Sequence, residues 1–200
     1  MNRLTFVAGL ALSAHAAPRL GGCPKDYKPM ETFDLARYTG KWYEIVRDKY
    51  TPFELFSSCV TAEYTANADD TITVHNSAYR LIFGTHDATA TAVQSSSGDA
   101  SLVVNFKGSV PDPTDKANYT VLDTDYDTYS VVYSCGEFMG LASFDFLWVL
   151  SREPTMDDET LLSIVEKIDA KLPDYGFFAN HHMTHQGWLC PDREQTSEEL

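Results

Sequence analysis

Residues 40–48 read Gly-Lys-Trp-Tyr-Glu-Ile-Val-Arg-Asp, and this stretch begins the series of strands that decides the fold. Because β-branched and aromatic residues favour extended backbone, we predict a strand over residues 42–48. Segments of the same kind recur along the chain. They predict seven further strands, at residues 58–64, 71–79, 87–94, 102–107, 119–123, 129–135 and 146–150.

Short polar segments separate these strands. Residues 67–70, 95–99, 111–113 and 125–127 supply the Asn, Asp, Ser, Gly and Pro that tight connections use. No helical pattern intervenes, and parallel strands would need one for each crossover. The sequence therefore predicts an all-β domain, either an antiparallel sandwich or an up-and-down barrel.

One helix follows the last strand. Pro154-Thr155 followed by Asp158 has the pattern of a capping box, and Pro173 ends the segment. Its apolar residues recur at helical spacing, which predicts packing against the outside of the sheet. They are Leu161, Leu162, Val165, Ile168 and Leu172.

The N-terminus has the pattern of a secretory signal peptide. Arg3 precedes an apolar run at residues 4–14, and Ala14 and Ala16 are the small residues of a cleavage site. We therefore predict a signal peptide over residues 1–16, a single domain over residues 17–200 and an extracellular, secreted product. No later run is long enough to span a bilayer.

Composition limits the possible partners. The 200 residues are 44% hydrophobic, enough for a sizeable core, and the formal net charge is −14. A field of that sign repels phosphate backbones, so nucleic acid is excluded as an expected partner.

The cysteines are Cys23, Cys59, Cys135 and Cys190, and they are widely scattered. No Cys-x-x-Cys pair indicates a zinc site. In an exported chain two disulfides are expected, and the spacing leaves all three pairings open.

The sequence contains no motif of a hydrolase, a metalloprotease or a phosphate-binding loop, so we predict no catalytic residue, cofactor or metal. His181, His182 and His185 form one cluster that a helix would bring together for metal binding. Since the cluster follows Pro173 and Gly176, we expect a solvated loop instead.

Three segments together resemble the signature regions of the lipocalin family. They are Gly40-Lys41-Trp42-Tyr43, Thr124-Asp125-Tyr126 and Arg152 before the helix. Further matches are similar to the apolipoprotein D group of that family. These are Cys23-Pro24, Phe33-Asp34, Val132-Tyr133-Ser134-Cys135 and Phe144-Asp145-Phe146 leading to Trp148.

The resemblance implies a closed eight-stranded antiparallel up-and-down barrel around one small apolar ligand, with the helix outside. It implies structural roles for Gly40, for the Thr124-Asp125-Tyr126 turn, and for Trp42 as a plug under Arg152. It also implies the disulfides Cys23–Cys135 and Cys59–Cys190.

Strand periodicity then selects candidate ligand contacts. If Arg152 points inward to Trp42, Phe146 and Trp148 share its face. Val74, Asn76 and Arg80 share one face of the third strand, and the resemblance places Asn76, Arg80 and Tyr64 at the pocket. Tyr64 and Trp148 would alternatively fill the core, and Asn76 and Arg80 would alternatively lie in water at the rim. The remaining predicted contacts are Tyr119, Val121, Val131 and Tyr133.

The sequence thus predicts a secreted carrier of a lipid, fatty acid, sterol or retinoid. The alternatives are a carotenoid or bilin carrier, a lipid-modifying enzyme using Cys59 as a thiol, and a protein-interaction module. Residues 50–56 expose aromatic side chains for gating or for transient membrane or receptor contact, and we expect a monomer or weak oligomer. Asn118-Tyr119-Thr120 is a glycosylation pattern that would place Asn118 outward.

Overall fold

The computed structural model describes residues 19–139, 141–188 and 190–191. The predicted signal peptide lies outside the described residues. Eight strands follow one another between residues 40 and 151. They are β2 (Gly40–Asp48), β3 (Ser58–Ala66), β4 (Ile72–Arg80), β5 (Gly84–Gln94), β6 (Ser101–Asn105), β7 (Tyr119–Thr124), β8 (Tyr129–Phe138) and β9 (Ala142–Ser151).

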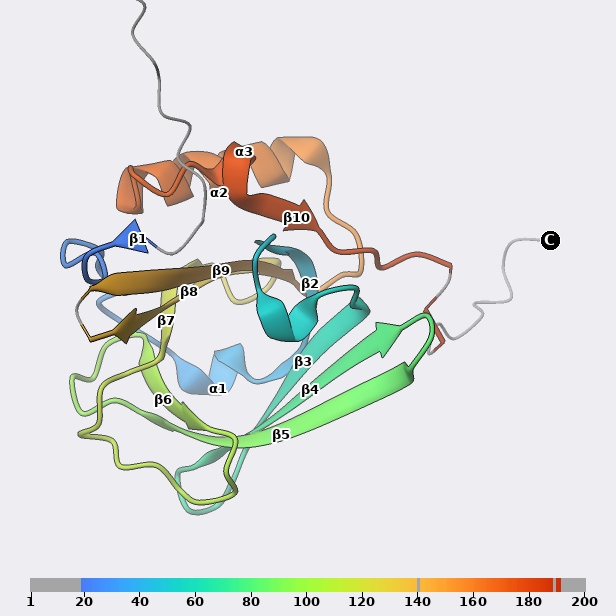
Figure 1. Cartoon of the computed structure of the whole chain (residues 1–200). Helices are drawn as coiled ribbons and strands as arrows, with labels where there is room; N and C mark the ends of the chain where they lie inside the picture. The colour runs from blue at the N-terminus through green and yellow to red at the C-terminus, as the bar shows by residue number, and fades with distance from the viewer. Residues whose placement is uncertain (1–18, 140, 189, 192–200) are drawn as a thin grey trace, which may run out of the picture.

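These strands form a closed antiparallel barrel (Figure 1). Each strand from β2 to β8 pairs with the next along the chain, and β9 pairs back to β2. The prediction of an eight-stranded antiparallel barrel is confirmed, and the sandwich alternative is wrong. The strand boundaries differ from the predicted ones by a few residues; β5, for example, begins at Gly84 rather than at residue 87.

Two short strands extend the sheet outside the barrel. β1 (Arg19–Leu20) pairs with β9, and β10 (His181–Met183) pairs with the end of β2. The expectation of a loop at the histidine cluster is therefore wrong for His181 and His182. A four-residue helix, α3 (Phe177–Asn180), precedes β10 and turns the chain back onto the sheet.

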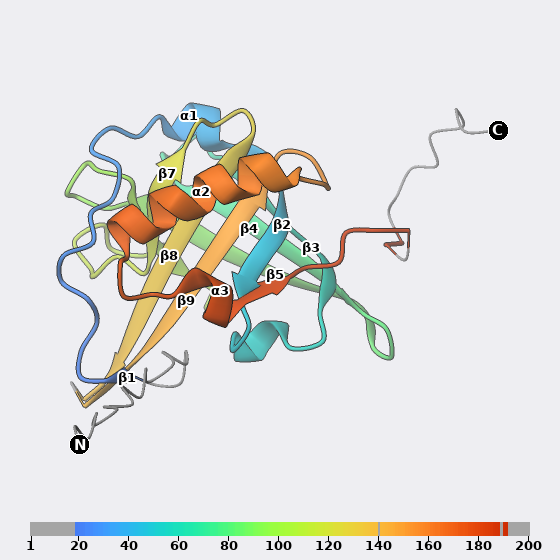
Figure 2. The same ribbon diagram turned by 90° about the horizontal axis from the view of Figure 1, so that it is seen from above.

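The helix α2 (Asp158–Lys171) lies across the outer face of the sheet that includes β8 and β9 (Figure 2). Its N-cap is Asp157, whose side chain accepts from the backbone N–H of Thr160. The capping box predicted at Thr155 and Asp158 is thus wrong by two residues. Leu162 is exposed and Ile164 is buried in its place, because the helix is rotated slightly from the predicted face.

Apolar side chains form two cores. One lies between α2 and the outer face of the sheet and includes Val131, Tyr133, Leu147 and Ile168. The other fills the end of the barrel interior around Trp42. A four-residue helix, α1 (Leu35–Tyr38), covers that end, and the 3-10 turn η1 (Pro52–Glu54) lies at the opposite end (Figure 2). None of the helices in the described chain has the length and apolar character needed to span a membrane.

Candidate functional site

A cavity of about 260 Å³ lies inside the barrel, above the core around Trp42. Its walls are mainly apolar, as in most sites for small ligands. The lining residues are Glu44, Phe53, Glu54, Val60, Thr61, Ala62, Tyr64, Val74, Asn76, Val104, Phe106, Asn118, Tyr119, Val132, Ser134, Phe146, Trp148 and Leu150.

Trp42 and Arg152 close one end of the barrel. Trp42 is fully buried, and its indole N–H donates to the carbonyl of Tyr38 at 2.9 Å. The Arg152 guanidinium carbon lies 3.6 Å from the centre of the Trp42 ring. Arg152 also donates to backbone carbonyls at Arg37, Thr39, Lys41 and Tyr126. These contacts hold three separate chain segments together at the closed end.

Gly40 and the turn after β7 shape the same end. Gly40 has a φ of +94°, and a Cβ there would lie 3.3 Å from the Arg152 guanidinium, so a larger residue would be strained. In the turn, one carboxylate oxygen of Asp125 accepts from three successive backbone N–H groups, those of Asp127, Thr128 and Tyr129. Thr124 caps this turn by accepting from the N–H of Tyr126 and donating to the carbonyl of Tyr129.

Three tyrosines join the closed end to the cavity. The Tyr119 hydroxyl lies 2.7 Å from that of Tyr38 and 2.8 Å from that of Tyr64, and Tyr38 also bonds Ser130 at 3.0 Å. Burial raises the pKa of Tyr38 to about 12 and raises the pKa values of Tyr64 and Tyr119 well above the ordinary value. The phenols are therefore neutral, and the chain of hydroxyls ends at Tyr64 on the cavity wall.

Most of the predicted contacts meet at this cavity. Six of the ten line it, and they come from β3, β4, β7 and β9: Tyr64, Val74, Asn76, Tyr119, Phe146 and Trp148. Asn76 stands out because its side-chain oxygen is buried yet has no hydrogen-bond partner within the described chain. A buried acceptor without a partner costs free energy, so this atom favours a ligand that donates to it.

The prediction that Val131 and Tyr133 face the cavity is wrong. Both belong to the core beneath α2, and the Tyr133 hydroxyl donates to Asp145. Their neighbours Val132 and Ser134 line the cavity instead, because they pair directly with Trp148 and Phe146 across β8 and β9. The pairing of β7 with β8 shifts register between Val121 and Asp123. The alternation of inward and outward residues along β7 therefore does not predict which residues of β8 point inward.

Two further predicted positions lie near the cavity but differ from expectation. Val121 is buried in the core at the closed end and does not line the cavity. Arg80 donates to the Phe53 carbonyl and to the Ser57 hydroxyl, so it holds the entrance turn rather than lining the cavity. Asn118 lines the cavity, and its amide exchanges two hydrogen bonds with the backbone of Val104 at 2.8 Å. Asn118 is exposed, as its predicted outward placement requires, and its glycosylation stays a prediction.

Sequence analysis missed an acidic pair in the cavity wall, formed by a buried Glu44 and a half-buried Glu54. Glu44 is 2% exposed and forms an ion pair with Arg47 at 3.0 Å. Arg47 uses its other donors on Thr184 and on the carbonyls of Glu54 and Ser57. The β-strand period signalled Glu44, because it is two residues from the inward-facing Trp42.

Glu54 comes from η1 and completes the pair. Its carboxylate oxygen accepts from the Trp148 indole N–H at 3.1 Å, and its side chain hydrogen-bonds that of Glu44. Burial, together with the nearby Glu44 carboxylate, raises the pKa of Glu54 to about 8. Burial also raises the pKa of Glu44, against the lowering effect of Arg47. Glu54 is therefore protonated at neutral pH when the cavity holds no ligand.

The entrance turn η1 packs over the cavity. The Phe53 ring lies 5.7 Å from that of Phe146 and 6.5 Å from that of Trp148, measured between ring centres. Together with the bond from Trp148 to Glu54, these contacts fasten the turn to β9. The turn therefore forms one edge of the cavity entrance.

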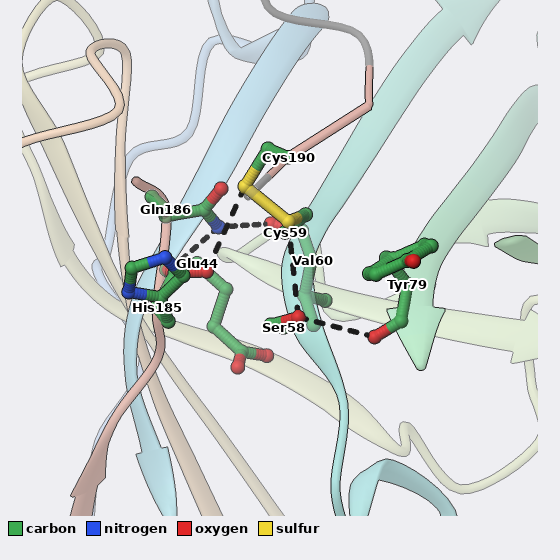
Figure 3. The surroundings of a disulfide bond; sticks show 8 residues. All are labelled: Glu44, Ser58, Cys59, Val60, Tyr79, His185, Gln186 and Cys190. Atoms are coloured by element: carbon green, nitrogen blue, oxygen red, sulfur yellow. Dashed lines mark hydrogen bonds between the residues drawn. A yellow bond between two sulfur atoms is a disulfide. The ribbon is translucent and has the colours of Figure 1, made fainter. Parts of the chain in front are cut away.

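The segment that carries His185 and Gln186 lies between β2 and β3, next to Glu44 (Figure 3). Gln186 donates to the carbonyls of Glu44 and Val60, and the N–H of Cys59 donates to the carbonyl of His185. The Cys59–Cys190 disulfide holds the segment in place, and Cys23 pairs with Cys135. Both implied disulfides are thus confirmed, and the alternative of an enzyme with a free Cys59 thiol is wrong.

Comparisons with known proteins agree with this geometry. The lipocalin-like domain family matches residues 33–181. The chain belongs to the lipocalin family.

Two curated relatives and one solved structure show which lipocalins this chain is similar to. Apolipoprotein D of Rattus norvegicus is 33% identical over 160 residues, covering 79% of this chain and 81% of that protein. The Lazarillo protein of Schistocerca americana is 32% identical over 170 residues, covering 80% and 73%. Among solved structures, insecticyanin from the tobacco hornworm Manduca sexta superposes with a TM-score of 0.69 at 22% identity, covering 84% and 87%. Within its family, the chain resembles apolipoprotein D.

Proposed function

We propose that this lipocalin binds a small hydrophobic ligand inside its barrel and carries it outside the cell. The observation that carries the proposal is the cavity itself, a hollow with mainly apolar walls closed at one end by Trp42. Apolar area removed from water contributes about 25 cal/mol per Å², which is the source of affinity in such a site. Two disulfides support an oxidising, extracellular location.

Trp148 provides the test. We expect Trp148→Ala to weaken binding of N-phenyl-1-naphthylamine, an uncharged apolar dye, by about tenfold, because it removes a large apolar contact. Trp188→Ala is the matched control, since Trp188 is 78% exposed and does not line the cavity. Equal dye affinity in the two variants would contradict a binding site in the barrel.

A pigment carrier is the second candidate. Insecticyanin and the crustacyanins superpose on this chain at identities of 19–22%, a likeness that extends to the fold alone. Visible absorbance of protein purified from its natural source tests this candidate, and native mass spectrometry of the same sample identifies any cargo.

We extend the proposal to the way a ligand enters. Loops at the mouth carry exposed apolar side chains, namely Phe56 beside η1 and Leu81, Ile82 and Phe83 in the β4–β5 turn. Such a cluster suits transient contact with a lipid surface. Co-flotation with phosphatidylcholine vesicles that is weakened by Phe56→Ser and Ile82→Ser would support this entry route, whereas unchanged flotation would contradict it.

A further inference from the structure

The charged groups in the cavity wall all have one sign. Within the described chain, Glu44 and Glu54 are the lining residues with charged side chains, and no lysine, arginine or histidine lines the cavity. Arg47, the cation paired with Glu44, is 4% exposed and donates to Glu44, Thr184 and two carbonyls. A ligand carboxylate would therefore find no free cationic partner there.

The two carboxyl groups also need a proton or another cation to offset their negative charge. Their side chains are hydrogen-bonded, and Arg47 compensates the charge of only one. When two carboxyl groups lie so close in a site shielded from water, one of them keeps its proton unless another cation accompanies them. Before a ligand binds, a proton on Glu54 meets this need.

A second, separate feature points to a ligand that donates hydrogen bonds. The Asn76 side-chain oxygen is buried in the same cavity wall and has no partner in the described part of the chain. It lies on β4, whereas the carboxyls come from β2 and η1. Hydrogen-bond acceptors thus reach the cavity from more than one side.

We propose that the cavity prefers an amphiphilic amine, with its hydrocarbon part against the apolar walls and its ammonium group at the Glu54 and Glu44 carboxylates. This inference rests on the proposed function and names its ligand class. On binding, the ammonium takes the place of the Glu54 proton, which passes to solvent. The ligand N–H groups then donate to carboxylate oxygens, and charge-assisted hydrogen bonds of this kind are stronger than neutral ones.

The titrating groups around the ammonium site are few. Glu44 and Arg47 face it from β2, and the phenols of Tyr64 and Tyr119 across the cavity stay neutral. Thr184 and Trp148 contribute an uncharged hydroxyl and an indole N–H. Proton release on binding near neutral pH is therefore a property of the acidic pair.

The test uses three ligands that share one hydrocarbon chain: dodecylamine, dodecanol and dodecanoate. At pH 7 each competes with N-phenyl-1-naphthylamine for the full-length protein. We expect dodecylamine to bind at least about tenfold more tightly than dodecanoate and more tightly than dodecanol, which corresponds to about 1.4 kcal/mol or more. Calorimetry in buffers of different ionisation enthalpy should show close to one proton released per dodecylamine bound.

Glu54→Gln keeps the shape of the side chain but cannot ionise. We expect this variant to bind dodecylamine no more tightly than dodecanol and to release no proton on binding. Glu63→Gln is the control, since Glu63 is exposed on β3 outside the cavity. Near-ultraviolet circular dichroism checks that both variants fold.

The outcomes separate the two proposals. If dodecanol or dodecanoate binds as tightly as the amine, or if Glu54→Gln keeps the amine preference, the amine inference is overturned and the carrier function stands. If neither the dye nor any of the three ligands binds, both proposals are overturned.

Discussion

The guanidinium of Arg152 lies 3.6 Å from the centre of the Trp42 ring and at the same time donates to backbone carbonyls of two other segments, residues 37–41 and the turn at Tyr126. The first contact is a cation–π interaction, worth about 0.5–2 kcal/mol depending on how well it is desolvated. The hydrogen bonds give donors to backbone carbonyls at the end of α1 and in the β7–β8 turn. One side chain therefore holds together the plug, the N-terminal segment and the last strand of the barrel.

Arg152→Ala should lower the free energy of unfolding by about 2–4 kcal/mol, because it removes this stacking and leaves several carbonyls without donors. Urea denaturation measures the change. Arg37→Ala is a suitable control, since Arg37 forms an ion pair with Asp127 at a site where both side chains are more than half exposed. That pair should contribute less than about 1 kcal/mol, so equal losses in the two variants would contradict a special role for Arg152.

Neighbouring valines on β8 test which face of this strand meets the ligand. Val132→Phe should fill part of the cavity and weaken dye binding by about tenfold or more while the fold persists. Val131→Phe should instead overpack the core under α2 and cost about 1–3 kcal/mol of stability, with little change in affinity. Dye titration and thermal unfolding of both variants distinguish the faces. The reverse pattern would show that the register is wrong.

The raised pKa of Glu54 makes the stability of the protein depend on pH. The folded state keeps the Glu54 proton up to about pH 8, whereas the unfolded chain releases it near 4.5, so between these values the folded state binds more protons. The free energy of unfolding should therefore fall as pH rises through this window, with a slope of at most about 1.4 kcal/mol per pH unit from this group.

Glu54→Gln should flatten that slope, and urea midpoints measured from pH 5 to pH 8 give the comparison. A smaller slope should remain, because burial also raises the pKa values of Glu44 and Asp48. A wild-type profile that rises with pH, or one that Glu54→Gln leaves unaltered, would contradict the assignment.

The Cys59–Cys190 disulfide spans 131 residues and fastens the segment that lies between β2 and β3. Replacing both cysteines by serine should cost about 4–5 kcal/mol in the chain-entropy model. Because this segment also contacts Glu44 through Thr184 and Gln186, hydrogen exchange should increase at β10 and at the end of β2 before global unfolding. Stability within 1 kcal/mol of the wild type would show that the other contacts suffice.

The strands of the barrel were predictable because their signal is local. The composition of residues 40–48 and of the seven later segments favours extended backbone, and the short polar connections exclude crossover helices. Resemblance to a family then supplied the closed topology, the partner of each cysteine and the stacking of Arg152 on Trp42. The inward set on β9 also followed, since Phe146, Trp148 and Arg152 are separated by an even number of residues.

By itself, the sequence determined which segments are strands and which residues share a face within each strand, because both depend on neighbours in the chain. Only the tertiary structure decided which face of β8 points inward, since that depends on pairing across strands and on the register shift after Val121. It also brought Glu54 of η1 against Glu44 of β2 and set three tyrosine hydroxyls in one chain. These groups lie together because the barrel closes. The alternation of residues along one strand does not predict how that strand is aligned with its neighbours.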